Sequence, residues 1–232
     1  MNRAVVPFSG GMDSTTILYH VKSIYDEVYT MSFYYGQKHR KELNIAQLTA
    51  QKLGVKEHKL IDISFFKDIA STSSLTNSDI DVAKAKDVMG DPQTVNYVPF
   101  RNMMLLSIAC AYAEAVGAET VYHGAAQADS VAGYWDGSPE FLSEINKVTA
   151  LNRRNRISIK APLLTMSKSE IIKFGKEMGI NYADTWTCYE GEEKACGKCT
   201  ACALRIKGFI EAKIQDPLEY EIQIPWSKYI SS

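Results

Sequence analysis

The stretch that decides the fold is Ser9-Gly10-Gly11-Met12-Asp13-Ser14-Thr15, close to the start of the chain. A short apolar run precedes it and apolar residues at helical spacing follow it, so we expect a strand, a glycine turn and a helix. The glycines allow a tight bend and let a ligand approach the backbone closely. The first N–H groups of the helix attract an anion. This stretch predicts a site for phosphate or pyrophosphate, formed by Ser9, Gly10, Gly11, Asp13, Ser14 and Thr15.

Two other phosphate-binding motifs are excluded. The stretch lacks the lysine of the G-x-x-x-x-G-K-[ST] loop, and it does not match G-x-G-x-x-G. A purely structural serine-glycine turn is the alternative. We favour the binding site because all the defined positions occur together, directly after a predicted strand.

Strand and helix patterns alternate along most of the chain. After the first strand and helix, the sequence predicts four more strands, near residues 27–33, 55–63, 120–125 and 157–161, with helices between them. This alternation predicts an α/β fold with a doubly wound, mostly parallel sheet of five strands. Ligands of such sheets bind beyond the carboxyl ends of the strands. Residues 65–98 have no clear periodicity, and we expect either a flap over the site or a solvated excursion.

Four of the five cysteines lie close together near the end of the chain, in a C-x7-C-x2-C-x2-C pattern. Four thiolates at such spacing predict a structural zinc site, formed by Cys188, Cys196, Cys199 and Cys202. An iron–sulfur cluster is the alternative, and the spacing fits it less well. The sequence therefore predicts two parts, a nucleotide-binding domain over residues 1–183 and a small zinc-binding region over residues 184–232.

Composition limits the class of protein. The 232 residues carry a net charge of −1 and no basic tail, which argues against a nucleic-acid partner. We expect no signal peptide and no membrane partner, because no apolar run approaches the ~20 residues that a membrane helix needs. We therefore expect a cytoplasmic protein with reduced cysteines.

The motifs, taken in order, resemble those of known enzymes. The first stretch is similar to the SGGxDS loop of the PP-loop ATP pyrophosphatases, which cleave ATP between the α and β phosphates. The sequences YGQKHRKEL, YVPFRN, APLLTMSKSEI and TWTCYEGEEKACGKCTAC begin at residues 35, 97, 161 and 185. Together with the first motif, they look like the 7-cyano-7-deazaguanine synthase (QueC) family over nearly the full length.

This resemblance implies an activity. The family converts 7-carboxy-7-deazaguanine and ammonia to the nitrile, in queuosine biosynthesis, using ATP twice. The acid is activated as an acyl adenylate, ammonia yields the amide, and adenylation of the amide oxygen allows the nitrile to form. The implied cofactors are ATP, Mg²⁺ and Zn²⁺, and the family usually forms homodimers.

The resemblance also implies roles for particular residues. The implied catalytic residues are Ser9, Asp13, Ser14, Lys168 and His39, and a structural role is the alternative for His39. The phosphate loop, Lys168, Arg101 and Asn102 are expected to bind ATP and Asp13 to orient Mg²⁺, although a capping and surface role is the alternative for Arg101 and Asn102. Substrate binding is expected of Gln37, Asp129, Tyr134 and Asp136.

One loop departs from the family pattern. The family commonly has an Asp-Cys-Arg-Pro-Glu-Phe run, whereas this chain has Gly137 and Ser138 at the Cys and Arg positions. An alternative function is therefore a relative that activates the same acid but passes it to another amine, such as a protein in phage or antiphage defence. A tRNA-modifying PP-loop enzyme would need a basic surface. A non-catalytic nucleotide-binding protein fits poorly with an intact SGGMDS loop and Lys168.

Overall fold

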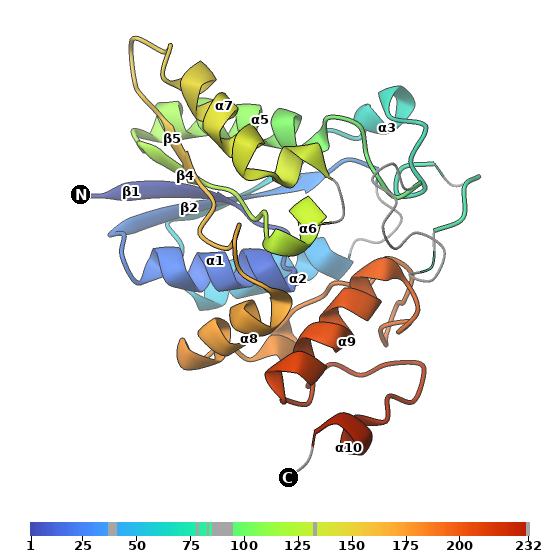
Figure 1. Cartoon of the computed structure of the whole chain (residues 1–232). Coiled ribbons are helices and arrows are strands. Elements are labelled where there is room, and N and C mark those ends of the chain that lie inside the picture. Colours follow the sequence, from blue (N-terminus) through green and yellow to red (C-terminus); the bar gives the residue numbers. More distant parts are fainter. Residues whose placement is uncertain (37–40, 78, 83, 85–94, 132–133, 231–232) are drawn as a thin grey trace.

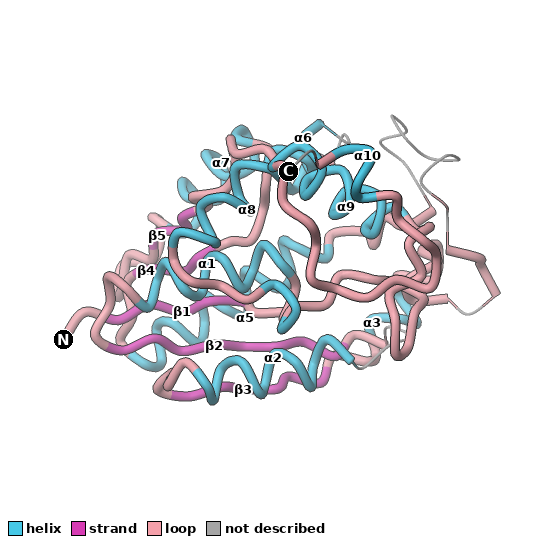
Figure 2. Tube along the Cα trace, turned by 90° about the horizontal axis from the view of Figure 1, so that it is seen from below, coloured by secondary structure: helices cyan, strands magenta, loops and turns pink. Residues whose placement is uncertain are grey.

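The five strands form one parallel sheet. In the computed structural model, which describes residues 1–36, 41–77, 79–82, 84, 95–131 and 134–230, the strand order is β3-β2-β1-β4-β5 and neighbouring strands of this sheet run parallel. The predicted five-stranded parallel α/β fold is confirmed. Figure 2 shows the strands side by side. Their bounds are β1 Arg3–Pro7, β2 Glu27–Tyr34, β3 Glu57–Asp62, β4 Thr120–Tyr122 and β5 Ser158–Lys160.

β1 lies at the centre of the sheet because apolar residues cover both of its faces. Ala4 and Val6 pack into one hydrophobic cluster and Val5 packs into another, which is the alternation of a β-strand. A strand buried on both faces reads as a continuous apolar run, and Ala4, Val5 and Val6 have no exposed surface. The loop that follows β1 is therefore held at the middle of the sheet edge.

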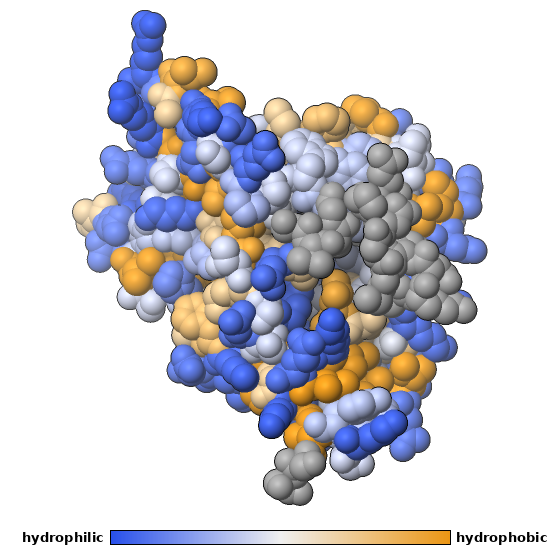
Figure 3. Space-filling view, in the orientation of Figure 1, coloured by the Kyte–Doolittle hydropathy of each residue, from blue (hydrophilic) through white to orange (hydrophobic). Residues whose placement is uncertain are grey.

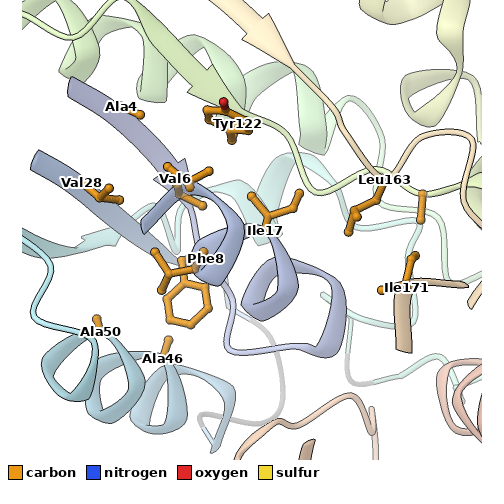
Figure 4. Packing of buried hydrophobic residues seen from close by; sticks show 13 residues of the cluster. Ala4, Val6, Phe8, Ile17, Val28, Ala46, Ala50, Tyr122, Leu163 and Ile171 are labelled. Atoms are coloured by element: carbon orange, nitrogen blue, oxygen red, sulfur yellow. The ribbon is translucent and has the colours of Figure 1, made fainter. Parts of the chain in front are cut away.

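Helices cover both faces of the sheet (Figure 1). On one face lie α1 (Met12–Lys22), α2 (Lys41–Lys52) and α8 (Lys168–Glu177), and on the other lie α5 (Arg101–Val116) and α7 (Pro139–Thr149). Figure 4 shows the first cluster, where Ala46 of α2 faces Phe8, Ile17 of α1 lies beside Val6, and Ile171 of α8 lies next to Leu163. α2 approaches the loop after β1 closely, since a Cβ at Gly10 would lie 2.9 Å from the Ala46 backbone nitrogen.

Two helix starts follow the sequence signals. Ser138 accepts a hydrogen bond from the Phe141 N–H at 3.0 Å, with Pro139 in the first turn of α7. Ser167 and Glu170 form the predicted capping box at the start of α8. These caps fix where each helix begins, and in α8 the cap places Lys168 as the first helical residue.

The C-terminal part packs against the α/β layers. α9 (Thr200–Ala212) lies beside α8, and the closest approach is made by Gly208, where a Cβ would lie 2.6 Å from the Lys168 Cβ. The division of the chain into residues 1–183 and 184–232 stays a prediction. The short helices are α3 Phe66–Ile69, α6 Gln127–Val131 and α10 Trp226–Tyr229, with 3₁₀ turns at Trp135–Gly137 and Tyr182–Asp184.

The segment without periodicity packs against the cysteine segment where the structure describes it. Leu75 and Val82 are buried in one cluster with Trp186 and Cys188. The Ser74 hydroxyl donates to Asn96 at 2.6 Å. These buried contacts exclude a fully solvated excursion for the described part of residues 65–98.

The helices of the described residues include none that is both long and apolar enough to cross a membrane. On the face seen in Figure 3, hydrophilic residues gather over the loop between α7 and β5. Arg153, Arg154 and Arg156 are exposed in that loop.

Candidate active site

The loop after β1 is held by its own hydroxyl groups. The Ser9 and Ser14 hydroxyls lie 3.0 Å apart, and the Ser14 hydroxyl donates to the Gly11 carbonyl at 3.2 Å. Gly10 has a positive φ of 76°, and a Cβ there would lie 2.8 Å from the Glu42 carbonyl oxygen. Glycine is required at this position both by the backbone conformation and by the close approach of α2. The loop therefore enters α1 in the geometry expected of an anion site.

A partly buried ion pair lies beside this loop. The Lys168 ammonium is 2.5 Å from the Asp13 Oδ2, joining the start of α8 to the start of α1. Burial lowers the pKa of Lys168, but the charges of Asp13 and Asp129 outweigh it, so the net pKa is raised and the side chain stays charged.

Two oxygen atoms next to this pair have no partner. Asp13 Oδ1 and Thr15 Oγ1 are buried, and neither forms a hydrogen bond with any residue that the structure describes. Buried polar atoms normally have a partner, and of these two residues only Asp13 lines the cavity, so its free carboxylate oxygen indicates a place where a ligand completes the bonding. A carboxylate oxygen also suits Mg²⁺, which prefers oxygen ligands.

A cavity of about 300 Å³ opens in front of the loop. Seven of the predicted site residues line it: Ser9, Gly11, Asp13, Ser14, Arg101, Asn102 and Asp129. The cavity also has residues that were not predicted, among them Tyr35, Glu42, His123, Trp186 and Tyr189. Its wall thus combines hydroxyls, charged groups and aromatic rings, as in sites for planar, charged small molecules.

The remaining predicted residues fall into two groups. Gly10, Thr15, Lys168, Tyr134 and Asp136 are next to the lining residues along the chain or through contacts, but they are not part of the lining. Gln37 and His39 lie outside the described residues.

Arg101 and Asn102 begin α5 after a sharp turn. Phe100 has a positive φ of 54°, which is uncommon for a side chain of this size and is often found at functional sites. The Arg101 guanidinium donates to the Tyr35 hydroxyl at 3.3 Å and lies 5.6 Å from the centre of that ring. Burial lowers the pKa of Arg101, but Tyr35 and Tyr189 outweigh it, and the net pKa is raised. The guanidinium is therefore a permanent positive charge in the cavity wall.

Glu42 adds a carboxyl group to the cavity wall. Burial raises the pKa of its carboxyl to about 7, against the lowering effect of Arg101. Glu42 is in the first turn of α2 and follows the YGQKHR stretch closely. This position next to a recognised motif is the sequence signal by which Glu42 could have been predicted as a site residue.

The loop after β4 has the departure from the family pattern. A Cβ at Gly137 would lie 2.7 Å from the Asp129 Cβ, so a larger residue does not fit this conformation. The Tyr134 and Tyr97 rings stack with centres 6.0 Å apart, and the Trp135 indole donates to the Tyr97 hydroxyl at 2.7 Å. Close packing against Asp129 thus explains why this loop has a glycine at position 137.

Asp136 lies in the same loop and is 3% exposed. Burial raises the pKa of its carboxyl, and the Asn102 backbone N–H donates to it. This contact connects the loop to the start of α5.

The four predicted cysteines come together. Their sulfur atoms all lie within 4.8 Å of one another, and the Cys196 and Cys202 sulfurs are 3.9 Å apart. Zinc–sulfur bonds of about 2.3 Å in a tetrahedron place the sulfurs about 3.8 Å apart, so the cluster fits a zinc ion. The backbone N–H groups of Gly191 and Cys196 donate to the Cys188 sulfur at 3.0 and 3.2 Å. Hydrogen bonds from the neighbouring thiols and these N–H groups hold the pKa of Cys188 far below its usual value.

The cysteine segment is joined directly to the phosphate loop. The Trp186 backbone N–H donates to the Gly10 carbonyl at 3.1 Å, and its indole donates to the Cys188 carbonyl at 3.0 Å. Arg205, which is 1% exposed, pairs with Asp216 at 2.7 Å and donates to the Thr185 hydroxyl. The cysteine cluster therefore supports one wall of the cavity without lining it.

The sheet order and the loop after β1 define a nucleotide-binding α/β protein of the PP-loop class. The sequence profile described as "Queuosine biosynthesis protein QueC" matches residues 3–213. The chain belongs to the QueC family, and the recognition of this family from the motifs is confirmed.

The relatives agree with this family. A protein of Caldicellulosiruptor bescii, named 7-cyano-7-deazaguanine synthase, is 45% identical over 97% of this chain and 100% of its own length. A protein of Colwellia psychrerythraea, named 7-cyano-7-deazaguanine synthase 1, is 44% identical over 94% of this chain and 99% of its own length. Among solved structures, the NH3-dependent NAD synthetase of Campylobacter jejuni has a TM-score of 0.48 and 16% identity, covering 76% of this chain and 63% of that one.

Proposed function

We propose that the protein is a 7-cyano-7-deazaguanine synthase. It converts 7-carboxy-7-deazaguanine and ammonia to 7-cyano-7-deazaguanine through an adenylated acid and an adenylated amide. The observation that carries this proposal is the buried oxygen Asp13 Oδ1, which has no hydrogen bond among the described residues and belongs to a carboxylate that lines the cavity and pairs with Lys168. The names of the full-length relatives supply the substrate.

The chemistry explains why the reaction needs ATP. A carboxylate or amide oxygen is a poor leaving group, whereas AMP is a good one, so each oxygen is adenylated before it leaves. The charge that develops on pyrophosphate is stabilised by donors already in place. We assign this task to the first N–H groups of α1, the hydroxyls of Ser9, Ser14 and Thr15, and the Lys168 ammonium.

Mg²⁺ fits the donor atoms at this point. The Asp13 carboxylate would hold it, since it lines the cavity and its Oδ1 has no hydrogen bond among the described residues. When bound, Mg²⁺ neutralises charge on the phosphates of ATP. Asp13 also orients Lys168 through their ion pair.

The rest of the cavity suits a planar acid. Arg101 and Asn102 are assigned to the nucleotide, and Arg101 adds a positive charge close to the anionic groups. The residues proposed for the deazapurine are Gln37, Asp129, Tyr134 and Asp136, and His39 is proposed as a catalytic residue. We assign a structural role to the zinc ion, because four cysteines leave no ligand position open.

The proposal also covers the compartment, the oligomeric state and the partners of the enzyme. We propose a cytoplasmic homodimer whose partners are small molecules, without nucleic acid. The net charge of −1 supports the absence of a nucleic-acid partner. A zinc site of four cysteines requires reduced thiols, and this supports the cytoplasm as the compartment.

The decisive test measures pyrophosphate and AMP release with 7-carboxy-7-deazaguanine and ammonia, and identifies the product by its mass. We expect two AMP for each nitrile formed. AMP release with another carboxylate, and none with this acid, would refute the substrate. An adduct with a different amine in place of the nitrile would favour the alternative acceptor, and release that depends on tRNA would favour a tRNA-modifying enzyme.

A further inference from the structure

The end of β4 adds a histidine to the cavity wall. His123 follows Tyr122, the last residue of β4, and lines the cavity together with Ser9 of the loop after β1. β1 and β4 are neighbours in the sheet. In the sheet, β2 and β3 lie on one side of β1, and β4 and β5 lie on the other side. His123 and the phosphate loop therefore meet at the point where the strand order reverses, and reactants of open α/β sheets bind there.

One hydrogen bond determines which nitrogen of His123 carries the proton. Nε2 lies 3.3 Å from the backbone carbonyl oxygen of Asp136. A carbonyl oxygen only accepts hydrogen bonds, so Nε2 is the donor and Nδ1 of the neutral ring carries a free lone pair. No residue in the described part of the chain forms a hydrogen bond with Nδ1.

The surroundings keep this ring neutral. Burial lowers the pKa of His123 below its ordinary value of 6.5, and Arg101 lowers it further. The carboxylates of Asp129 and Asp136 and the Asp136 carbonyl oppose this effect but do not overcome it. Phe141 of α7 contacts the ring edge to face, with centres 6.5 Å apart, and adds no charge. An imidazole that is neutral at pH 7 is ready to accept a proton.

The loop after β4, in which this chain departs from the family pattern, orients the His123 ring. Asp136 holds His123 through its backbone carbonyl, while the Asp136 carboxylate accepts the Asn102 N–H. Gly137 lets the same loop lie against Asp129, where a Cβ would meet the Asp129 Cβ at 2.7 Å. Asp136 is therefore a positioning residue for His123.

We propose that Nδ1 of His123 accepts the proton that ammonia loses when it attacks the adenylated acid. This inference rests on the proposed function. In the step, the nitrogen of ammonia forms a C–N bond to the acyl carbon and one N–H proton passes to Nδ1. The C–O bond to AMP breaks, and its electron pair stays on the phosphate oxygen. The imidazolium then returns the proton to solvent, leaving the amide and AMP.

His123→Gln is the sharpest variant. The glutamine amide nitrogen occupies a position close to Nε2 and can still donate to the Asp136 carbonyl, but the variant has no basic nitrogen at the place of Nδ1. We expect ammonia-dependent amide formation to fall about 10²- to 10⁴-fold, the usual loss when a general base is removed. ATP–pyrophosphate exchange driven by the acid without ammonia should change less than about threefold, because that half-reaction precedes the attack. The matched control is His20→Gln, which alters a histidine on α1 outside the cavity lining and should leave both rates unchanged.

The outcomes separate this inference from the proposed function. If the wild-type enzyme shows no acid-dependent exchange, the proposed function fails. If the wild-type enzyme shows exchange and amide formation and His123→Gln retains both, the inference about His123 fails and the proposed function stands. An equal loss of exchange and amide formation in His123→Gln also overturns the inference, because it assigns His123 to adenylation or to folding.

A measurement on the unaltered enzyme gives a second test. The rate of amide formation, expressed per concentration of unprotonated ammonia, should fall at a pH below 6.5, where His123 becomes protonated and no longer acts as a base. Below the pKa of His123, the rate should approach a tenfold loss for each pH unit. A rate that stays flat at every pH at which ATP–pyrophosphate exchange remains active would overturn the inference.

Discussion

Replacing Gly10 by alanine tests whether the loop after β1 depends on close contact with α2. Gly10 has a φ of +76°, and its Cβ would lie 2.8 Å from the Glu42 carbonyl oxygen and 2.9 Å from the Ala46 backbone nitrogen. The left-handed conformation costs an alanine about 1 kcal/mol. The clash is with helix backbone, which cannot rotate away, and adds about 1–3 kcal/mol. We therefore expect Gly10→Ala to lower the free energy of unfolding by about 2–4 kcal/mol.

Gly54→Ala separates the two contributions. Gly54 also has a positive φ, of 58°, but nothing lies within 4 Å of its Cβ position, so only the conformational cost of about 1 kcal/mol remains. In thermal unfolding at constant zinc, we expect a fall in Tm of about 2–4 °C for Gly54→Ala and about 4–16 °C for Gly10→Ala. Because the Gly10 carbonyl accepts the Trp186 N–H, Gly10→Ala should also lose at least about tenfold in ATP–pyrophosphate exchange, whereas Gly54→Ala should not. Equal falls in Tm, or full exchange activity in folded Gly10→Ala, would refute the reasoning.

Three further predictions concern charges and the metal. Lys168→Met should lower pyrophosphate release by at least about 10²-fold, because it removes the cation beside Asp13, while the exposed Lys176→Met on the same helix should leave release unchanged; equal activities would contradict the role of Lys168. Cys199→Ser should abolish stoichiometric zinc, measured by elemental analysis, and Cys110→Ala should retain it; iron in the wild-type protein would contradict the zinc assignment. The pKa of Glu42 is about 7 in the folded protein against 4.5 for the free side chain, so the folded state loses stability as the pH rises through this interval. The loss amounts to about 3 kcal/mol, and urea unfolding at pH 5 and pH 8 should show Glu42→Gln lacking this part of the difference; parallel behaviour of the two proteins would contradict it.

Much of the fold could be predicted from local patterns. The apolar run before Ser9, the caps at Ser138 and Ser167, and the alternation of strands and helices each report on neighbours within a few residues. The four-cysteine pattern also predicted a cluster, because its members lie within fifteen residues and the chain needs only short turns to gather them. Features that depend only on residues close in the chain can be predicted from the sequence alone.

Only seven of the residues that line the cavity were predicted, for a physical reason. Glu42 and Trp186 lie within stretches that resemble the family, but no local pattern marks them or His123 as cavity residues, and each reaches the cavity from a different part of the chain. The chemical state of these groups is also not local. Glu42 has a raised pKa because the fold buries it, and His123 has its tautomer because a loop thirteen residues further on presents a carbonyl.

By itself, the sequence determined a strand, a glycine loop and a helix with the features of an anion site, and a cysteine cluster that fits a metal. These follow from backbone freedom, helix ends and ligand spacing, which act over a few residues. The tertiary structure alone decided that Trp186 meets Gly10, that Lys168 meets Asp13, and that His123 stands at the wall next to the loop. Such contacts depend on the order of strands in the sheet and on the packing of α2, α8 and the cysteine segment against its edge. Residues more than a hundred positions apart become neighbours only when the whole core forms, and no short stretch of sequence records that.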